Sequence, residues 1–164
     1  MDKEIFKNWK KYAEKEEDRN YRFIKSLKFK NQKKVDSLAE NLHNKAFDKI
    51  NCLDCGNCCK TSKPLIEKED ITKISEFLNI PKKQMISDYL EKDSDGDWTF
   101  NSLPCPFLNQ ADNKCKIYSS RPKDCREFPH TNKEGFASRS FIHSANTIEC
   151  PAVYYIVEQM RGLI

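Results

Sequence analysis

Four cysteines within eight residues, from Cys52 to Cys59, constrain this chain more than any other feature of its sequence. The segment Cys-Leu-Asp-Cys-Gly-Asn-Cys-Cys repeatedly leaves two residues between cysteines, a spacing that lets the backbone turn several sulfurs onto one ion or cluster. Gly56 permits a left-handed backbone step within that turn. Four further cysteines follow at wider intervals: Cys105, Cys115, Cys125 and Cys150. Eight thiols in 164 residues indicate either a disulfide framework or metal centres.

The cellular compartment decides between disulfides and metal. Residues 1–7 contain no apolar run that could serve as the core of a signal peptide. No stretch of the chain approaches the roughly 18 consecutive apolar residues of a membrane span. We therefore expect a soluble protein of the reducing cytoplasm, without membrane association, in which thiols stay free and bind metal.

All eight cysteines are candidate metal ligands, and no cofactor beyond the metal is expected. Eight thiolates suit two tetrahedral zinc sites, two iron–sulfur clusters, one of each, or a single cluster with spare thiols. Three cysteines at the first spacing also begin the ferredoxin-type binding run. The adjacent Cys58 and Cys59 would point to opposite sides of an extended backbone and reach different metal atoms. These two features favour iron–sulfur slightly over zinc, whereas His130 and His143 are weaker candidates for ligands.

Apolar spacing predicts a mainly α chain with a small β element. Helical periodicity runs through residues 5–13 and 35–50, and a break is expected near residues 29–32. Residues 64–90 predict two short helices that meet at Pro81. Pro151 opens a last helix that carries Val153, Ile156, Val157 and Met160, with Cys150 at its N-cap.

Turn-forming residues predict the β element. The acidic run at residues 93–97 indicates a turn before a short strand at residues 98–100. Residues 107–118 can form a hairpin that places Cys105 and Cys115 near one end. Cys125 is expected on a short helix after Pro122, and residues 129–149 show no period and predict a loop with a short strand.

Charge divides the chain into two parts. Residues 1–50 carry 14 Lys and Arg against 9 Asp and Glu and contain no cysteine, so we interpret them as a basic, amphipathic helical segment. Residues 51–164 are then the cysteine-cluster metal-binding part of a single compact domain organised around its multi-cysteine centre. The basic cluster Lys28, Lys30, Lys33 and Lys34 is more typical of a solvated face than of a phosphate site. Nucleic acid is therefore not expected as a partner, while an unidentified protein partner is compatible with the sequence.

Several motifs together resemble the bacterial CxxCxxCC cysteine-cluster family, a zinc- or iron-chelating domain. They are Cys52 to Cys59, Pro104-Cys105-Pro106-Phe107-Leu108, Cys115-Lys116-Ile117-Tyr118, Arg121 to Pro129 and Cys150-Pro151. The resemblance covers about residues 50–155 and implies that all eight cysteines belong to the metal site. The segment is also similar to the cluster of flagellin lysine methylases, which implies an iron–sulfur centre and a distant enzymatic relationship.

The favoured function is therefore a non-enzymatic metal-binding protein with a structural, electron-handling or metal-handling role. The first alternative is a small metalloenzyme, but thiols are plentiful here while an obvious catalytic pair is missing. The second alternative is a structural zinc module in an adaptor that binds nucleic acid or protein. Only the charge of residues 1–50 supports the nucleic-acid version of that alternative.

Overall fold

The computed structural model describes the chain from residue 3 to residue 164, with side chains from Asn8 onward. Ile5 and Phe6, expected on the apolar face of the first helix, lie outside the described side chains. Contacts divide the chain into two compact units. Met1–Asn51 and Pro129–Ile164 form one, here called the helical unit. Cys52–Phe128 forms the other, here called the cysteine unit.

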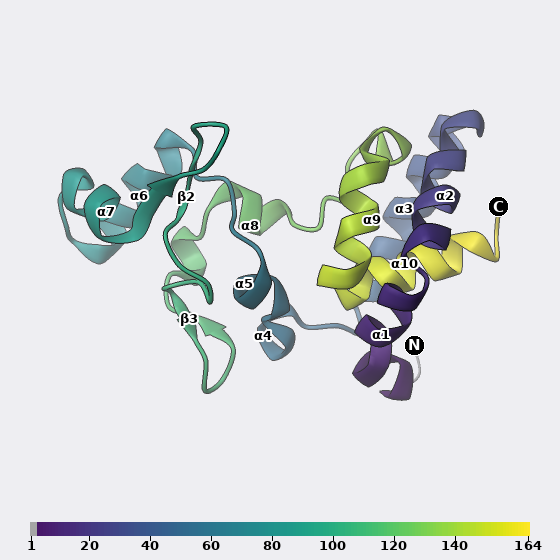
Figure 1. Ribbon diagram of the computed structural model, residues 1–164, viewed down its shortest axis with the longest axis horizontal. Coiled ribbons are helices and arrows are strands. Elements are labelled where there is room, and N and C mark those ends of the chain that lie inside the picture. Colours follow the sequence, from purple (N-terminus) through teal and green to yellow (C-terminus); the bar gives the residue numbers. More distant parts are fainter. Residues whose placement is uncertain (1–2) are drawn as a thin grey trace. The chain divides into compact units, whose positions relative to one another are not determined.

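Helices make up the helical unit, and Figure 1 shows α9 and α10 together with α2 and α3. The elements in chain order are α1 (Lys3–Lys15), α2 (Glu17–Ser26), the 3-10 turn η1 (Leu27–Phe29), α3 (Gln32–Phe47), the 3-10 turn η3 (Phe136–Arg139), α9 (Ser140–Glu149) and α10 (Pro151–Arg161). The Asn31 side chain caps α3 by accepting a hydrogen bond from the Lys34 amide at 3.1 Å. One stripe of α3 is buried: Val35, Ala39, Leu42 and Ala46. The helices predicted in residues 5–13 and 35–50 and after Pro151 are confirmed, apart from the ends of the α3 prediction.

The prediction for residues 129–149 is wrong from residue 136 onward, because this part forms η3 and α9 instead of a loop with a short strand. The face of α9 that packs inward is polar and includes His143, Ser144 and Thr147. Its exposed face carries apolar residues, with Phe141 78% exposed. Helix α9 therefore has no inward apolar period, which is the pattern on which a sequence-based helix prediction depends.

The C-terminal part of the chain returns to the N-terminal helices. Helix α10 contacts α3, α9 and α1, and its apolar residues Val153, Ile156, Val157 and Met160 are fully buried. The predicted boundary at residues 50 and 51 lies next to the first division between the units, at Asn51 and Cys52. The second division, at Phe128 and Pro129, differs from the prediction, which assigned residues 129–164 to the cysteine-rich part.

Short elements build the cysteine unit, and Figure 1 shows α6 and α7 beside strand β2. They are α4 (Cys52–Cys55), α5 (Asn57–Thr61), α6 (Lys68–Leu78), α7 (Lys82–Tyr89), β1 (Leu90–Lys92), β2 (Trp98–Phe100), β3 (Leu108–Asn109), β4 (Lys114–Cys115), the 3-10 turn η2 (Tyr118–Ser120) and α8 (Lys123–Glu127). Strands β1 and β2 pair antiparallel, and so do β3 and β4, with Leu108 opposite Cys115. The two helices that meet at Pro81, both β segments and the short helix after Pro122 are as predicted.

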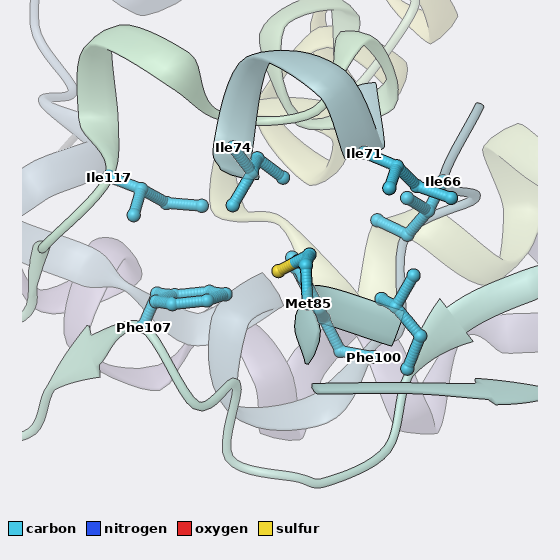
Figure 2. Close-up of a cluster of buried hydrophobic side chains, with 8 residues drawn as sticks. Ile66, Ile71, Ile74, Met85, Phe100, Phe107 and Ile117 are labelled. Atoms are coloured by element: carbon cyan, nitrogen blue, oxygen red, sulfur yellow. The ribbon is translucent and has the colours of Figure 1, made fainter. Parts of the chain in front are cut away.

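A single apolar cluster forms the core of the cysteine unit (Figure 2). Its buried members are Ile66, Ile71, Ile74, Met85, Leu90, Phe100, Phe107 and Ile117. Figure 2 shows Phe107 and Ile117 near Met85 and Ile74, so the segment around β3 and β4 covers one side of this core. Cys105 and Cys115 pack against the same cluster. The described chain is thus mainly α with a small β element, as the sequence predicts, and the core supports two cysteine-bearing segments.

Candidate metal centre

The segment from Cys52 to Cys59 folds into two short helical turns joined at Gly56. Helix α4 is a single turn with Cys52 at its first position, and the Gly56 amide donates to the Cys52 carbonyl at 2.9 Å. Gly56 has a φ of 57°, which reverses the chain into α5 with Cys58 and Cys59. Four thiols are therefore held on two consecutive turns, as the spacing in the sequence indicates.

Asn113 packs against this reversal from the turn between β3 and β4. A Cβ atom added at Gly56 would lie 3.0 Å from the Asn113 Cβ atom. The Asn113 side-chain amide donates a hydrogen bond to the Asp54 carbonyl at 3.2 Å. The β3–β4 turn therefore fixes the position of the segment that carries the first four cysteines.

Backbone hydrogen bonds join Cys59, Cys105 and Cys115. The Cys105 amide donates to the Cys59 carbonyl at 2.7 Å, and the Cys105 carbonyl accepts from the Leu108 amide at 2.9 Å. Leu108 in turn pairs with Cys115 across the β3–β4 ladder. Three cysteines that are far apart in sequence are consequently connected through two hydrogen bonds and one strand pair.

Asp70 positions the helix that carries Cys125. The Asp70 side chain is 2% exposed, and its Oδ1 atom accepts a hydrogen bond from the Lys123 amide at 3.0 Å, at the first position of α8. Its other oxygen accepts from the Glu67 amide at 3.1 Å, which completes the capping box of α6. Asp70 was not among the predicted site residues, because the pair Glu67 and Asp70 departs from the Ser/Thr-x-x-Glu/Gln sequence pattern of a capping box.

Four thiols lie close enough together to affect one another's ionisation. Burial, with further contributions from the neighbouring Cys59 and Cys115, raises the pKa of Cys105 to about 11. Burial also raises the pKa of Cys115, with Cys59 adding to the effect. The pKa of Cys125 is raised well above its ordinary range by burial and then by Cys59, Cys105 and Cys115. Simultaneous ionisation of these four thiols is unfavourable unless a cation compensates their charge.

The first cysteines have a different electrostatic environment. A hydrogen bond from the Cys58 thiol lowers the pKa of Cys59 to about 7, although burial opposes this shift. Burial and the neighbouring Cys55 raise the pKa of Cys52, while the Arg121 guanidinium lowers it. Arg121 also lowers the pKa of Cys115. This arginine stacks over the Tyr118 ring at 3.9 Å and supplies positive charge to thiols of both groups.

The donor set of the cysteine unit fits a soft, thiolate-bound metal. The unit holds seven of the eight cysteines, and its sequence contains no histidine. Among the described side chains, from residue 8 onward, no group of three His, Cys, Asp or Glu is already arranged around a common point that could hold an ion. A cysteine sulfur moves by rotation about a single side-chain bond.

Cys150 belongs to the helical unit, whereas the other seven predicted ligands belong to the cysteine unit. It is buried at the N-cap of α10, where its amide donates to the Asn146 carbonyl at 2.8 Å. The predicted N-cap position is confirmed. The role of Cys150 as a metal ligand stays a prediction.

The three histidines also lie in the helical unit. His143 is fully buried and stacks on Phe136 at 4.2 Å between ring centroids, and the described residues offer neither ring nitrogen a hydrogen-bond partner. Burial lowers the pKa of His143 to about 3, with Arg139 and His130 adding to the effect. His143 is therefore a neutral core residue of this unit.

The thiol-rich, histidine-free site defines the class of the protein as a metal-binding cysteine-cluster protein. Residues 51–146 match the family model described as "CxxCxxCC: Putative zinc- or iron-chelating domain", and the chain belongs to this family. The matched segment includes the whole cysteine unit and ends before Cys150, which the resemblance in sequence had included.

One curated relative is archaeal: the uncharacterized protein MJ0661 of Methanocaldococcus jannaschii is 34% identical over 82 residues. The alignment covers 49% of this chain and 44% of the relative, so the match spans less than half of that protein's length. No solved structure matches the chain. In the part of the chain that the structure describes, no helix is both long enough and apolar enough to span a membrane.

Proposed function

We propose that this protein is an iron–sulfur protein in which cysteines of the cysteine unit hold a cluster. The observation that carries this proposal is seven thiols without a histidine in one unit, three of them at ferredoxin-like spacing on the two turns around Gly56. Two zinc sites of the usual kind need eight terminal ligands, typically Cys or His, and this unit supplies seven such side chains. An iron–sulfur centre uses the same thiols and can leave some of them uncoordinated.

A role in electron handling, together with a structural role, accounts best for the site. The apolar core of the cysteine unit contains eight buried residues, and its strands are two or three residues long. A metal centre would tie the segment around Gly56, the β3–β4 hairpin and α8 together, and so supplement this small core.

A non-catalytic function agrees with the roles of the polar side chains near the cysteines. Asp70 and Asp124 accept backbone hydrogen bonds, from Lys123 and from Leu65 respectively. Arg121 donates to the Tyr118 carbonyl at 2.7 Å. These side chains position segments of the chain. We propose that electrons pass between the metal centre and a protein partner in the reducing cytoplasm.

Metal analysis after anaerobic purification from iron-replete cells tests the proposal. We expect a brown protein with broad visible absorption, carrying iron and acid-labile sulfide in comparable amounts. Zinc is spectroscopically silent because its d shell is full. A colourless protein with about two zinc ions per chain and no sulfide would refute the iron–sulfur proposal and indicate a structural zinc protein.

The Cys150→Ser variant, purified in parallel, is the control for the helical unit. Unchanged iron and sulfide would limit the ligands to the cysteine unit. A fall in both would confirm the sequence-based prediction that Cys150 is a ligand.

A further inference from the structure

We propose that a basic turn of the helical unit, residues 27–34, binds single-stranded nucleic acid, with one base stacked on the Phe29 ring and the neighbouring phosphates paired with lysines. The lysines of this turn are Lys28, Lys30, Lys33 and Lys34. Charge alone is more typical of a solvated face, and the structure adds two observations to it: the exposure of Phe29 and the fixed backbone of the turn. The proposal does not depend on which metal the cysteine unit holds.

Phe29 is the most exposed of the large apolar side chains that the structure describes, with 90% of its surface open to solvent. Leu27, two residues before it, is fully buried, so the turn is anchored in the core of the helical unit while Phe29 projects from it. Isolated exposed apolar residues are common on proteins and need no ligand. Phe29 differs because a cation stands on each side of it in the sequence, at Lys28 and Lys30, and because its backbone is fixed.

Hydrogen bonds hold the backbone on both sides of Phe29. This residue ends the 3-10 turn η1, and the Lys30 amide donates to the Leu27 carbonyl at 3.1 Å. The Gln32 side-chain amide donates to the carbonyls of Leu27 and Lys30, at 2.9 Å and 2.7 Å respectively. The Asn31 side chain caps the helix that follows. An aromatic ring presented on a fixed backbone loses little conformational freedom when it binds a ligand.

No acidic residue interrupts the basic segment in which the turn lies. Residues 19–35 contain no Asp or Glu and seven basic side chains: Arg19, Arg22, Lys25, Lys28, Lys30, Lys33 and Lys34. The four lysines of the turn are exposed, and among the described side chains none of them pairs with a carboxylate. The next acid along the chain, Asp36, accepts hydrogen bonds from the Gly135 and Phe136 amides instead. The turn therefore carries positive charge that attracts an anion.

Single-stranded nucleic acid matches this arrangement better than other anions do. Each base in a strand has a phosphate on either side, and the Phe29 ring has a lysine on either side. Stacking on an aromatic side chain needs an unpaired base, because a duplex buries the faces of its bases. An anionic membrane would meet only one apolar side chain here, since residues 26, 28, 30 and 31 are polar and exposed. Membrane binding scales with the buried apolar area, which a single ring keeps small.

Fluorescence anisotropy of the full chain with a fluorescein-labelled oligothymidylate of about 20 nucleotides tests the proposal. We expect binding at low salt that weakens as salt is added. With four lysines on phosphates, the logarithm of the association constant should fall with the logarithm of the salt concentration with a slope of about −3. An oligouridylate of the same length, titrated in parallel, shows whether DNA or RNA is the preferred strand.

The ring is tested by Phe29→Ala. This change should weaken binding of the oligothymidylate about tenfold and leave binding of a duplex of the same length unchanged, because only an unpaired base can stack. Phe141 on α9 is the matched control, since it is 78% exposed and belongs to the same unit. Phe141→Ala should bind both probes like wild type. Both rings are exposed, so neither substitution removes core packing.

The charges are tested by a double variant, Lys28→Gln with Lys30→Gln. Each phosphate contact accounts for about 0.7 of the salt slope, so this variant should reduce the slope by about 1.4. Lys82 and Lys83 are consecutive exposed lysines at the start of α7. Lys82→Gln with Lys83→Gln should therefore leave the slope unchanged.

Three results would overturn the proposal. The first is no binding to either oligonucleotide at low salt, and the second is equal losses for Phe29→Ala and Phe141→Ala. The third is an equal loss of single-strand and duplex binding in Phe29→Ala, which would exclude stacking. Sedimentation with vesicles of phosphatidylcholine and phosphatidylglycerol supplies the last comparison. Binding to these vesicles without binding to either oligonucleotide would also overturn the proposal and would identify a membrane surface as the ligand.

Discussion

Replacing Gly56 with alanine should destabilise the cysteine unit more than the same change at a second left-handed glycine. Gly56 has a φ of 57°, and Gly96, in the turn between β1 and β2, has a φ of 86°. Both substitutions force alanine into a conformation that costs an L-residue about 1 kcal/mol. At Gly96 a new Cβ atom meets nothing within 4 Å, whereas at Gly56 it meets the Asn113 Cβ atom at 3.0 Å.

The contact with Asn113 sets the size of the difference. Moving this side chain weakens its hydrogen bond to the Asp54 carbonyl, which at an exposed position contributes about 0.5–1 kcal/mol. The total for Gly56→Ala is therefore about 2 kcal/mol, against about 1 kcal/mol for Gly96→Ala. Asn113→Gly removes the obstructing side chain, and glycine accepts the φ of 60° found there, so the loss caused by Gly56→Ala should shrink in that background.

The two tryptophans make this measurement possible, because each unit contains one. Trp98 lies in the cysteine unit and Trp9 in the helical unit, so fluorescence in a Trp9→Phe background reports unfolding of the cysteine unit alone. Urea unfolding of the metal-loaded variants gives the free energies of unfolding. Equal losses for Gly56→Ala and Gly96→Ala would refute the role of the Asn113 contact. So would an undiminished loss from Gly56→Ala in the Asn113→Gly background.

Three further predictions follow from the two units. His143 has its pKa lowered to about 3, so the folded protein resists the proton that the unfolded chain takes up near pH 6.5. The free energy of unfolding of the helical unit should therefore fall by about 2 kcal/mol between pH 7 and pH 5. His143→Phe should remove this loss, as measured by urea unfolding at each pH. Asp36 accepts hydrogen bonds from the amides of Gly135 and the following residue, both at 2.9 Å. Asp36→Ala should therefore lower the free energy of unfolding, followed by Trp9 fluorescence, by about 2–3 kcal/mol. A change below about 0.5 kcal/mol would contradict this role. Chelation of the metal should reduce protection from hydrogen exchange around Trp98 and leave protection around Trp9 intact. Equal protection around Trp98 before and after verified metal removal would contradict a structural role of the centre.

Elements with a regular apolar period or a clear turn signal could be predicted from the sequence. Helix α3 buries residues at spacings of three and four, and α10 begins at a proline in its first position. The turn before Trp98 is rich in aspartate and contains Gly96, so this turn and the strand after it could be predicted, whereas strand β1 was not predicted. In each case the local sequence contains the physical cause of the structure.

Helix α9 and the return of the chain to the helical unit could not be predicted in the same way. The inward face of α9 is polar, with Ser144 and Thr147 buried, and Thr147 donates to the Ser144 carbonyl at 2.7 Å. Asp36 fixes the start of η3 across about a hundred positions of the chain, at Gly135 and Phe136. Contacts of this kind depend on tertiary packing, which overrides local propensity and leaves no periodic trace in the sequence.

The way in which the fold brings the cysteines together likewise could not be predicted from the sequence. Spacing identified all seven thiols of the cysteine unit as candidates, but it did not indicate how they are grouped. The intervals from Cys105 to Cys115 and from Cys115 to Cys125 are equal in sequence. A strand pair spans the first interval, while the second ends in a helix whose position depends on the buried Asp70. The position of Cys125 therefore depends on a carboxylate more than fifty residues away in the sequence. Because Asp70 holds the start of the helix that carries Cys125, Asp70→Asn should lower the metal content of the anaerobically purified protein. Unchanged iron and sulfide per chain in that variant would show that this assignment of Asp70 is wrong.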